Sequence, residues 1–184
     1  TKNSSDPNSF DSGTSTTATG GTAQYAFQPD CNYSTGIQKW YGKVTDQYYK
    51  PNTTNNFTLK IKTYIAMNVS YPDGQSFLIG SLVPFIGRVY DECYNIPGAT
   101  VTFKDIKGDS QYSCQPVTDN NNGTYNCTFN TAGKPFDWHS IEMTANKEYY
   151  GSYPEPNTTT KTNAYFLASQ PSLSSLNVDP KLDG

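Results

Sequence analysis

Four cysteines, at positions 31, 93, 114 and 127, are the residues whose chemistry the sequence defines best. Zinc sites built on cysteine need closely spaced ligands such as Cys-x-x-Cys, and this chain has no such spacing and only one histidine. An even number of cysteines without metal spacing is typical of disulfide-bonded proteins in oxidising compartments. Three connectivities are possible. We favour Cys114 with Cys127, which leaves Cys31 to pair with Cys93.

The segment 110–130, SQYSCQPVTDNNNGTYNCTFN, is the reason for that pairing. Its Asn-Gly dipeptide at 122–123 is a strong turn signal, because glycine takes a positive φ without steric cost and asparagine tolerates it. If the flanking arms pair around the turn, Cys114 falls opposite Cys127. Opposed strand residues have Cβ atoms about 4.5–5.5 Å apart, close to disulfide reach. The segment therefore predicts an antiparallel hairpin held by its own disulfide.

Acceptor sites for N-linked glycans are frequent in this chain. The triplet Asn-x-Ser/Thr occurs about twice as often as the Ser, Thr and Asn content gives by chance. A chain rich in these residues also produces such triplets freely, which is the alternative interpretation. We expect a densely glycosylated extracellular protein, with glycans as its covalent modification. The acceptors are Asn3, Asn32, Asn52, Asn56, Asn68, Asn122, Asn126 and Asn157.

Catalytic and metal-binding patterns are weak. His139 is the single histidine, and the nucleophile pattern Gly-x-Ser-x-Gly is missing from the sequence. The run DNNNG at 119–123 resembles a calcium loop only superficially, because its Asp/Asn spacing is off by one and Asn130 stands where a bidentate glutamate belongs. We therefore expect a protein that is not an enzyme and uses no metal and no cofactor.

Composition and charge narrow the class of partner. The formal net charge is −3, only 16% of residues are charged, and no large block of either sign occurs, which argues against nucleic acid. The longest apolar run, residues 77–87, is too short to span a bilayer and contains Pro84. The sequence starts TKNSS, without Met or an apolar leader, so we expect that a signal peptide has been removed.

Short strands separated by turns account for most of the chain. Thr and Tyr favour strands, and no stretch of twelve residues carries a helical stripe. About ten such strands predict an all-β antiparallel sandwich over residues 23–184, with its first strand near 23–27. Residues 77–90 are the most apolar strand and are expected at the centre of a sheet. Residues 1–22, rich in Ser, Thr and Gly, cannot bury enough apolar surface to fold alone. They are expected to be either a disordered linker or an extended N-terminal tail that orders only on a partner.

Three stretches resemble the Ig-like surface domains of bacteria and archaea: GRVYDECYNIPGATVTFK at 87–104, NGTY at 122–125 and WHSIEMTANKEYY at 138–150. That pattern supports a fold rather than a function. The whole chain is more suggestive, since a strand-competent tail, a sandwich, dense sequons and two disulfides together resemble an archaeal thread filament subunit, a pilin-like surface protein.

The resemblance implies that subunits polymerise head to tail by donor-strand complementation. The tail would be the donor strand, with Phe10, Thr14, Thr16 and Ala18 entering a groove on the neighbouring subunit. That groove is expected beside residues 77–90. Donation of this kind covers an open sheet edge and generates a fibre.

Two functions follow from these expectations. The first is a structural subunit of an extracellular cell-surface filament or pilus that serves adhesion, with identical subunits and possibly surface glycans as partners. The alternative is a monomeric Ig-like adhesion or glycan-binding domain of a larger cell-surface protein. Tyrosine pairs at 48–49 and 149–150 could form an aromatic sugar-binding face, although packing within strands explains most such tyrosines.

Overall fold

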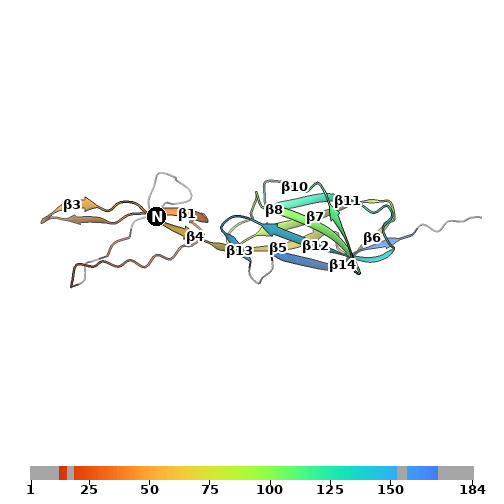
Figure 1. The fold of residues 1–184 in the computed structure, drawn as a ribbon, viewed down its shortest axis with the longest axis horizontal. Helices are drawn as coiled ribbons and strands as arrows, with labels where there is room; N and C mark the ends of the chain where they lie inside the picture. The colour runs from red at the N-terminus through yellow and green to blue at the C-terminus, as the bar shows by residue number, and fades with distance from the viewer. Residues whose placement is uncertain (1–12, 16–18, 153–156, 170–184) are drawn as a thin grey trace, which may run out of the picture.

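The computed structural model describes residues 13–15, 19–152 and 157–169, and in them the protein is all β (Figure 1). The described residues contain no α-helix, in agreement with the Thr- and Tyr-rich composition. The strands are β1 (Gly36–Trp40), β2 (Lys43–Asp46), β3 (Tyr49–Thr53), β4 (Phe57–Ile61), β5 (Thr63–Tyr71), β6 (Gln75–Leu78), β7 (Leu82–Tyr90), β8 (Thr100–Lys107), β9 (Ser110–Cys114), β10 (Thr118–Asp119), β11 (Thr124–Asn130), β12 (Asp137–Asn146), β13 (Tyr150–Ser152) and β14 (Thr158–Ala168).

Strands β5 to β14 form a sandwich of two five-stranded sheets. One sheet has the order β10-β11-β7-β5-β13 and the other the order β6-β14-β12-β8-β9. Most neighbours are antiparallel, and the two parallel pairs, β13 with β5 and β6 with β14, lie at sheet edges. The predicted β-sandwich is therefore confirmed.

The core lies between the two sheets and follows the two-residue period of strands. In β7, Val83, Phe85 and Val89 are fully buried, while Leu82 and Arg88 are exposed. Facing them, β8 contributes Phe103 and β12 contributes Met143, both also fully buried. Apolar side chains at alternate positions of both sheets thus hold the sandwich together.

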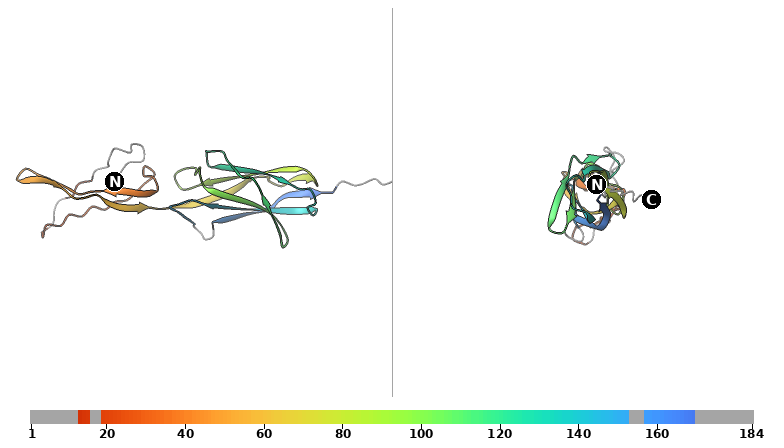
Figure 2. Two further views of the ribbon diagram at one scale, coloured as in Figure 1. Left: turned by 45° about the horizontal axis from the view of Figure 1, so that its top comes forward. Right: turned by 90° about the vertical axis from the view of Figure 1, so that its right-hand side faces the viewer.

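Strands β1 to β4 lie outside the sandwich and form a long two-stranded hairpin, which we call the arm (residues 36–61). β1 pairs with β4 and β2 pairs with β3, both antiparallel. At its tip the Tyr48 N–H donates to the Asp46 side chain at 2.7 Å. Lys62 alone separates β4 from β5, so the arm continues directly into the first sandwich strand. Figures 1 and 2 show the arm extending from one end of the sandwich, opposite the end where β14 finishes.

The predicted hairpin over 110–130 is wrong. β9 pairs with β8, with Cys114 opposite Phe103, whereas β11 pairs with β7 and β10. The two cysteines therefore lie in different sheets. Pro116, which has no N–H to donate, follows the end of β9, and the chain there crosses from one sheet to the other. The turn at Gly123 is present, but it joins β10 to β11.

Two other strand predictions differ from the structure. Residues 23–30 form no strand, and the sandwich strands begin at Thr63. The apolar stretch 77–90 is mostly β7, and its predicted central position is confirmed. β11 pairs along one edge of β7, whereas β5 pairs only with residues 86–90 on the other edge. Residues 82–85 have no partner strand on that second edge among the described residues, so the acceptor groove beside this strand stays a prediction.

Several predicted positions lie outside the described residues, namely Asn3, Phe10, Thr16 and Ala18. Thr14 is described, is exposed and belongs to no strand. The donor-strand assignment of the tail therefore stays a prediction.

Candidate functional site

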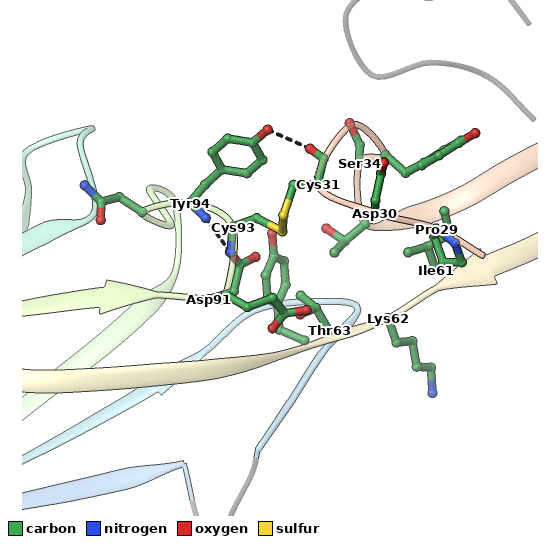
Figure 3. A pocket seen from close by; sticks show the side chains of 15 residues that line it. Pro29, Asp30, Cys31, Ser34, Ile61, Lys62, Thr63, Asp91, Cys93 and Tyr94 are labelled. Atoms are coloured by element: carbon green, nitrogen blue, oxygen red, sulfur yellow. Dashed lines mark hydrogen bonds between the residues drawn. A yellow bond between two sulfur atoms is a disulfide. The ribbon is translucent and has the colours of Figure 1, made fainter. Parts of the chain in front are cut away.

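The junction between arm and sandwich is fixed by a disulfide. Cys31, just before the arm, is bonded to Cys93, in the connection after β7 (Figure 3). Beside it the Tyr94 hydroxyl donates to the Cys31 carbonyl at 2.6 Å. The two cysteines are 62 residues apart in sequence. Their disulfide and the hydrogen bond from Tyr94 tie the segment that leads into the arm to the sandwich.

A hollow of about 470 Å³ lies at this junction, between the segment 29–35 and the connection 91–95. Its carboxylates already have partners. Asp91 accepts from the N–H groups of Cys93 and Tyr94, and Glu92 accepts from the Thr63 hydroxyl at 2.9 Å. No group of three or more metal-binding side chains occurs in the described residues. These contacts organise the junction and leave little chemistry for a ligand.

The arm carries several large apolar side chains that are exposed to solvent. Trp40 and Phe57 are opposite each other in the β1–β4 register and stack with their centroids 4.8 Å apart. At the tip, Tyr48 is 82% exposed and Tyr49 is 73% exposed. The further exposed members are Ile37, Tyr41 and Val44. Exposed apolar surface of this extent marks an interaction site more often than an ordinary surface.

The charge of the arm differs from that of the rest of the chain. Residues 36–61 contain four lysines and one aspartate, a formal charge of +3. The whole chain carries −3, so the remaining residues carry −6. The arm is therefore a basic, aromatic projection on an acidic body.

A second polar cluster lies inside the sandwich, where Asp105, His139 and Tyr165 are fully buried. The Asp105 carboxylate contacts His139 Nδ1 at 2.9 Å and accepts from the Tyr165 hydroxyl at 2.7 Å. His139 Nε2 donates to the Pro135 carbonyl at 2.9 Å. With oxygen atoms facing both ring nitrogens, the imidazolium form is favoured.

The pKa values of this cluster reflect burial and the carboxylate. Burial alone lowers the pKa of His139, but the hydrogen bonds to Asp105 and to the Pro135 carbonyl outweigh it and raise that pKa above its ordinary value of 6.5. Burial, and then the charge of Asp105, raise the pKa of Tyr165. The cluster is sealed from solvent, and its contacts join β8, β12 and β14 within the sandwich.

The predicted disulfides are both formed. Cys114–Cys127 joins β9 to β11 and so links the two sheets, and Cys31–Cys93 is the junction bond described above. Two disulfides are typical of proteins in oxidising compartments. No helix in the described part of the chain is long and apolar enough to cross a membrane.

The predicted glycan acceptors are placed as follows. Five are exposed, and Asn126 and Asn157 are half-buried. Asn126 accepts from Asn120 Nδ2, and Asn157 donates to Asn146. Cys127 is buried next to Asn126, so the disulfide faces the core as expected. Glycan attachment itself stays a prediction. The exposed acceptors are Asn32, Asn52, Asn56, Asn68 and Asn122.

The two tyrosine pairs do not form one aromatic face. Tyr48 and Tyr49 lie at the tip of the arm, whereas Tyr150 pairs with Thr63 at the start of the sandwich. Only the tip pair is strongly exposed. Residues 48–56, which contain Pro51 and two sequons, predict a loop between two strands from the sequence, whereas the structure has β3 there and joins it to β2 within the arm.

Comparison with known proteins gives no family. No family model matches the chain, and no curated protein matches it. One similar solved structure is the crystal structure of an engineered protein, with a TM-score of 0.33 and 14% identity, covering 58% of this chain and 20% of that chain. The chain thus spans about a fifth of that protein's length. A similarity of this degree supports no inference about fold or function.

Proposed function

We propose that the protein is a structural subunit of an extracellular, glycosylated filament that assembles head to tail by strand complementation and serves surface adhesion. One observation carries the proposal. The arm projects from the sandwich with Tyr48 and Tyr49 exposed at its tip and with the Trp40–Phe57 stack partly exposed. An isolated two-stranded hairpin is marginally stable in water, so a projecting arm gains from a partner that covers it.

An edge for strand addition also exists on the sandwich. β13 pairs only with residues 63–65 of β5. On that same edge of β5, residues 66–71 have no partner among the described strands, so this part of the edge is open. The Lys161 ammonium reaches the Val69 carbonyl on β5 at 3.3 Å. A donor strand from the tail of a neighbouring subunit, with Phe10, Thr14, Thr16 and Ala18, would extend the sheet along this edge.

The remaining parts of the proposal agree with this assembly. Disulfides and N-linked glycans suit a cell-surface location, and the filament needs identical subunits as its main partner. The fold serves as a structural unit without enzymatic activity and without a cofactor. A heterologous contact between identical copies that does not close into a ring produces a fibre.

A glycan-binding domain is the second candidate function. The exposed Tyr48 and Tyr49 at the arm tip favour it, because aromatic rings that present one face to solvent can stack on sugar rings. In that case the intact chain stays monomeric at high concentration and binds glycans through the tip.

Deletion of residues 1–22 tests the donor-strand assignment. The intact chain is expected to form filaments visible by electron microscopy, and the shortened chain is expected to remain monomeric with the same circular dichroism spectrum. If filaments form equally well without residues 1–22, the tail is not the donor strand. An intact chain that stays monomeric at all concentrations would instead favour the glycan-binding module.

A further inference from the structure

A second group of exposed apolar side chains lies at the end of the sandwich away from the arm. We call it the far-end patch, and its members are Leu78, Phe136 and Trp138. The neighbours Phe77 and His139 face the core, so Leu78 and Trp138 share the outer face of the sheet β6-β14-β12-β8-β9. β7 begins at Leu82 and reaches the junction at Tyr90, and β12 begins beside Trp138 and reaches Asn146 near the junction. β6, which ends at Leu78, lies at the same far end (Figures 1 and 2).

The far-end patch is held in place by the sandwich. Trp138 packs edge to face on Phe166 of the neighbouring strand β14, with centroids 5.5 Å apart. Leu78 is 45% exposed and Phe136 is 68% exposed. Two lysines lie close to the patch in the sequence or the fold, and the ammonium of one of them, Lys134, lies over the Tyr112 ring, 3.7 Å from its centroid. Lys107 donates to Asp137 at 2.7 Å, and this hydrogen bond lowers the pKa of the Asp137 carboxyl.

We infer that the arm of one copy docks on the far-end patch of the next. The inference rests on the proposed filament function and names the contact that would build it. The two apolar surfaces lie at opposite ends of one molecule, so they do not cover each other within a chain. A contact between unlike surfaces at opposite ends is heterologous, and it repeats along a fibre.

The opposite formal charges of the arm and the sandwich favour a second copy as the partner, with its sandwich against the arm. Two arms side by side would bring formal charges of +3 together, whereas residues 62–169 of the next copy, which contain seven Lys/Arg and ten Asp/Glu, carry −3. Opposite charges steer association and suppress the wrong pairing. Arm-to-body contact is thus favoured over arm-to-arm contact.

The glycan acceptors leave this contact open. None of the eight sequons falls within the far-end patch. On the arm, Asn52 is opposite Val44 in the register, so a glycan there shields the tip. Asn56 precedes Phe57, and neighbouring residues of an extended chain point to opposite faces. The Trp40–Phe57 stack is therefore the part of the arm that we assign to the contact.

Two double variants test the contact. The arm variant carries Trp40→Ser and Phe57→Ser, and the far-end variant carries Leu78→Ser and Trp138→Ser. All four side chains are exposed, so both variants are expected to fold, as circular dichroism can check. Each alone is expected to weaken self-association at least about 100-fold in sedimentation velocity, because apolar anchors dominate such interfaces. Tyr64→Ser, an exposed aromatic outside both surfaces, serves as the control that assembles normally.

Mixing the two variants gives the decisive result. Each retains the surface that the other has lost, so a 1:1 mixture is expected to form heterodimers that do not grow further. A far-end variant that assembles like the unmodified chain overturns the inference, as does a mixture that stays monomeric. If the unmodified chain forms filaments and both variants do so equally, this contact is wrong and the filament function stands. If the unmodified chain never assembles, the proposed function itself fails.

Discussion

The most constrained residues of the protein are the three that form the buried polar cluster. Asp105 accepts from His139 and Tyr165, and each of the three is fully buried. A charge in such a position is tolerated only when its partners are present. The cluster therefore gives the core a specific arrangement that apolar packing alone does not define.

Asp105→Ala is expected to destabilise the fold by about 3–5 kcal/mol, because it leaves a buried imidazolium without its counter-charge. Tyr165→Phe removes one hydrogen bond to the same carboxylate and is expected to cost about 1–3 kcal/mol. Urea unfolding of both variants measures the difference. Asp109→Ala, at an exposed position, is the matched control with little effect. Equal stability of the Asp105 and Asp109 variants would contradict the assigned ion pair.

The same cluster makes stability depend on pH. The pKa of His139 is raised in the folded state, so its contribution is fully present below the ordinary value of 6.5. That contribution is lost as pH rises through the folded pKa. The free energy of unfolding is therefore expected to fall as pH rises above 6.5, and His139→Gln is expected to remove this slope. An unchanged slope in that variant would assign the effect to other groups.

Residue-level features were only partly visible in the sequence. The cysteine pairing was predicted correctly, but for a reason that the structure overturns, since the bond links two sheets and not two arms of a hairpin. The sequence placed His139 in a strand without revealing Asp105 as its partner, 34 residues away. Such a pair depends on the register of β8 against β12. The alternation of apolar and polar residues in each strand shows which side chains face the core, but it does not show which residues of the two strands lie opposite each other.

At the level of elements, the turn that joins β10 to β11 depends on Gly123. Its φ is +81°, and its carbonyl accepts from the Val89 N–H at 2.8 Å. A Cβ there would lie 2.6 Å from the Cβ of Asn95 and 2.9 Å from the backbone nitrogen of Ile96. The position thus needs glycine for both its backbone conformation and its close contacts.

Gly123→Ala is expected to destabilise the fold by about 2–5 kcal/mol, from backbone strain together with overpacking. Gly133 also has a positive φ, of +70°, but a Cβ there meets nothing within 4 Å. Gly133→Ala is therefore expected to cost only about 1–2 kcal/mol. Thermal unfolding compares the two. If both substitutions cost the same, the contacts around Gly123 have no part in the effect.

Most strands could be predicted from the sequence, and the arm could not. Residues 37–47 and 57–69 read as strands, and each contains a strand of the structure, but nothing in their alternation separates arm residues from sandwich residues. The polar run 48–56 suggested a loop because it contains Pro51 and three asparagines. Pro51 is tolerated in β3 because the arm is a two-stranded ribbon with open edges.

At the scale of the whole molecule, the two ends differ. One end projects a basic aromatic arm that Cys31–Cys93 ties to the sandwich, and the other exposes an apolar patch on β6 and at the start of β12. This polarity is what head-to-tail assembly needs, and it arises from side chains far apart in sequence. The composition and the sequons predict a surface protein. Only the fold shows that the exposed apolar side chains lie at its two ends.

Electron microscopy of the protein in its native form tests the central claim most directly. Head-to-tail assembly predicts long, unbranched filaments with one sandwich per axial repeat and the arm bridging consecutive repeats. Single particles the size of one sandwich with its arm, seen at every concentration, would contradict the filament function.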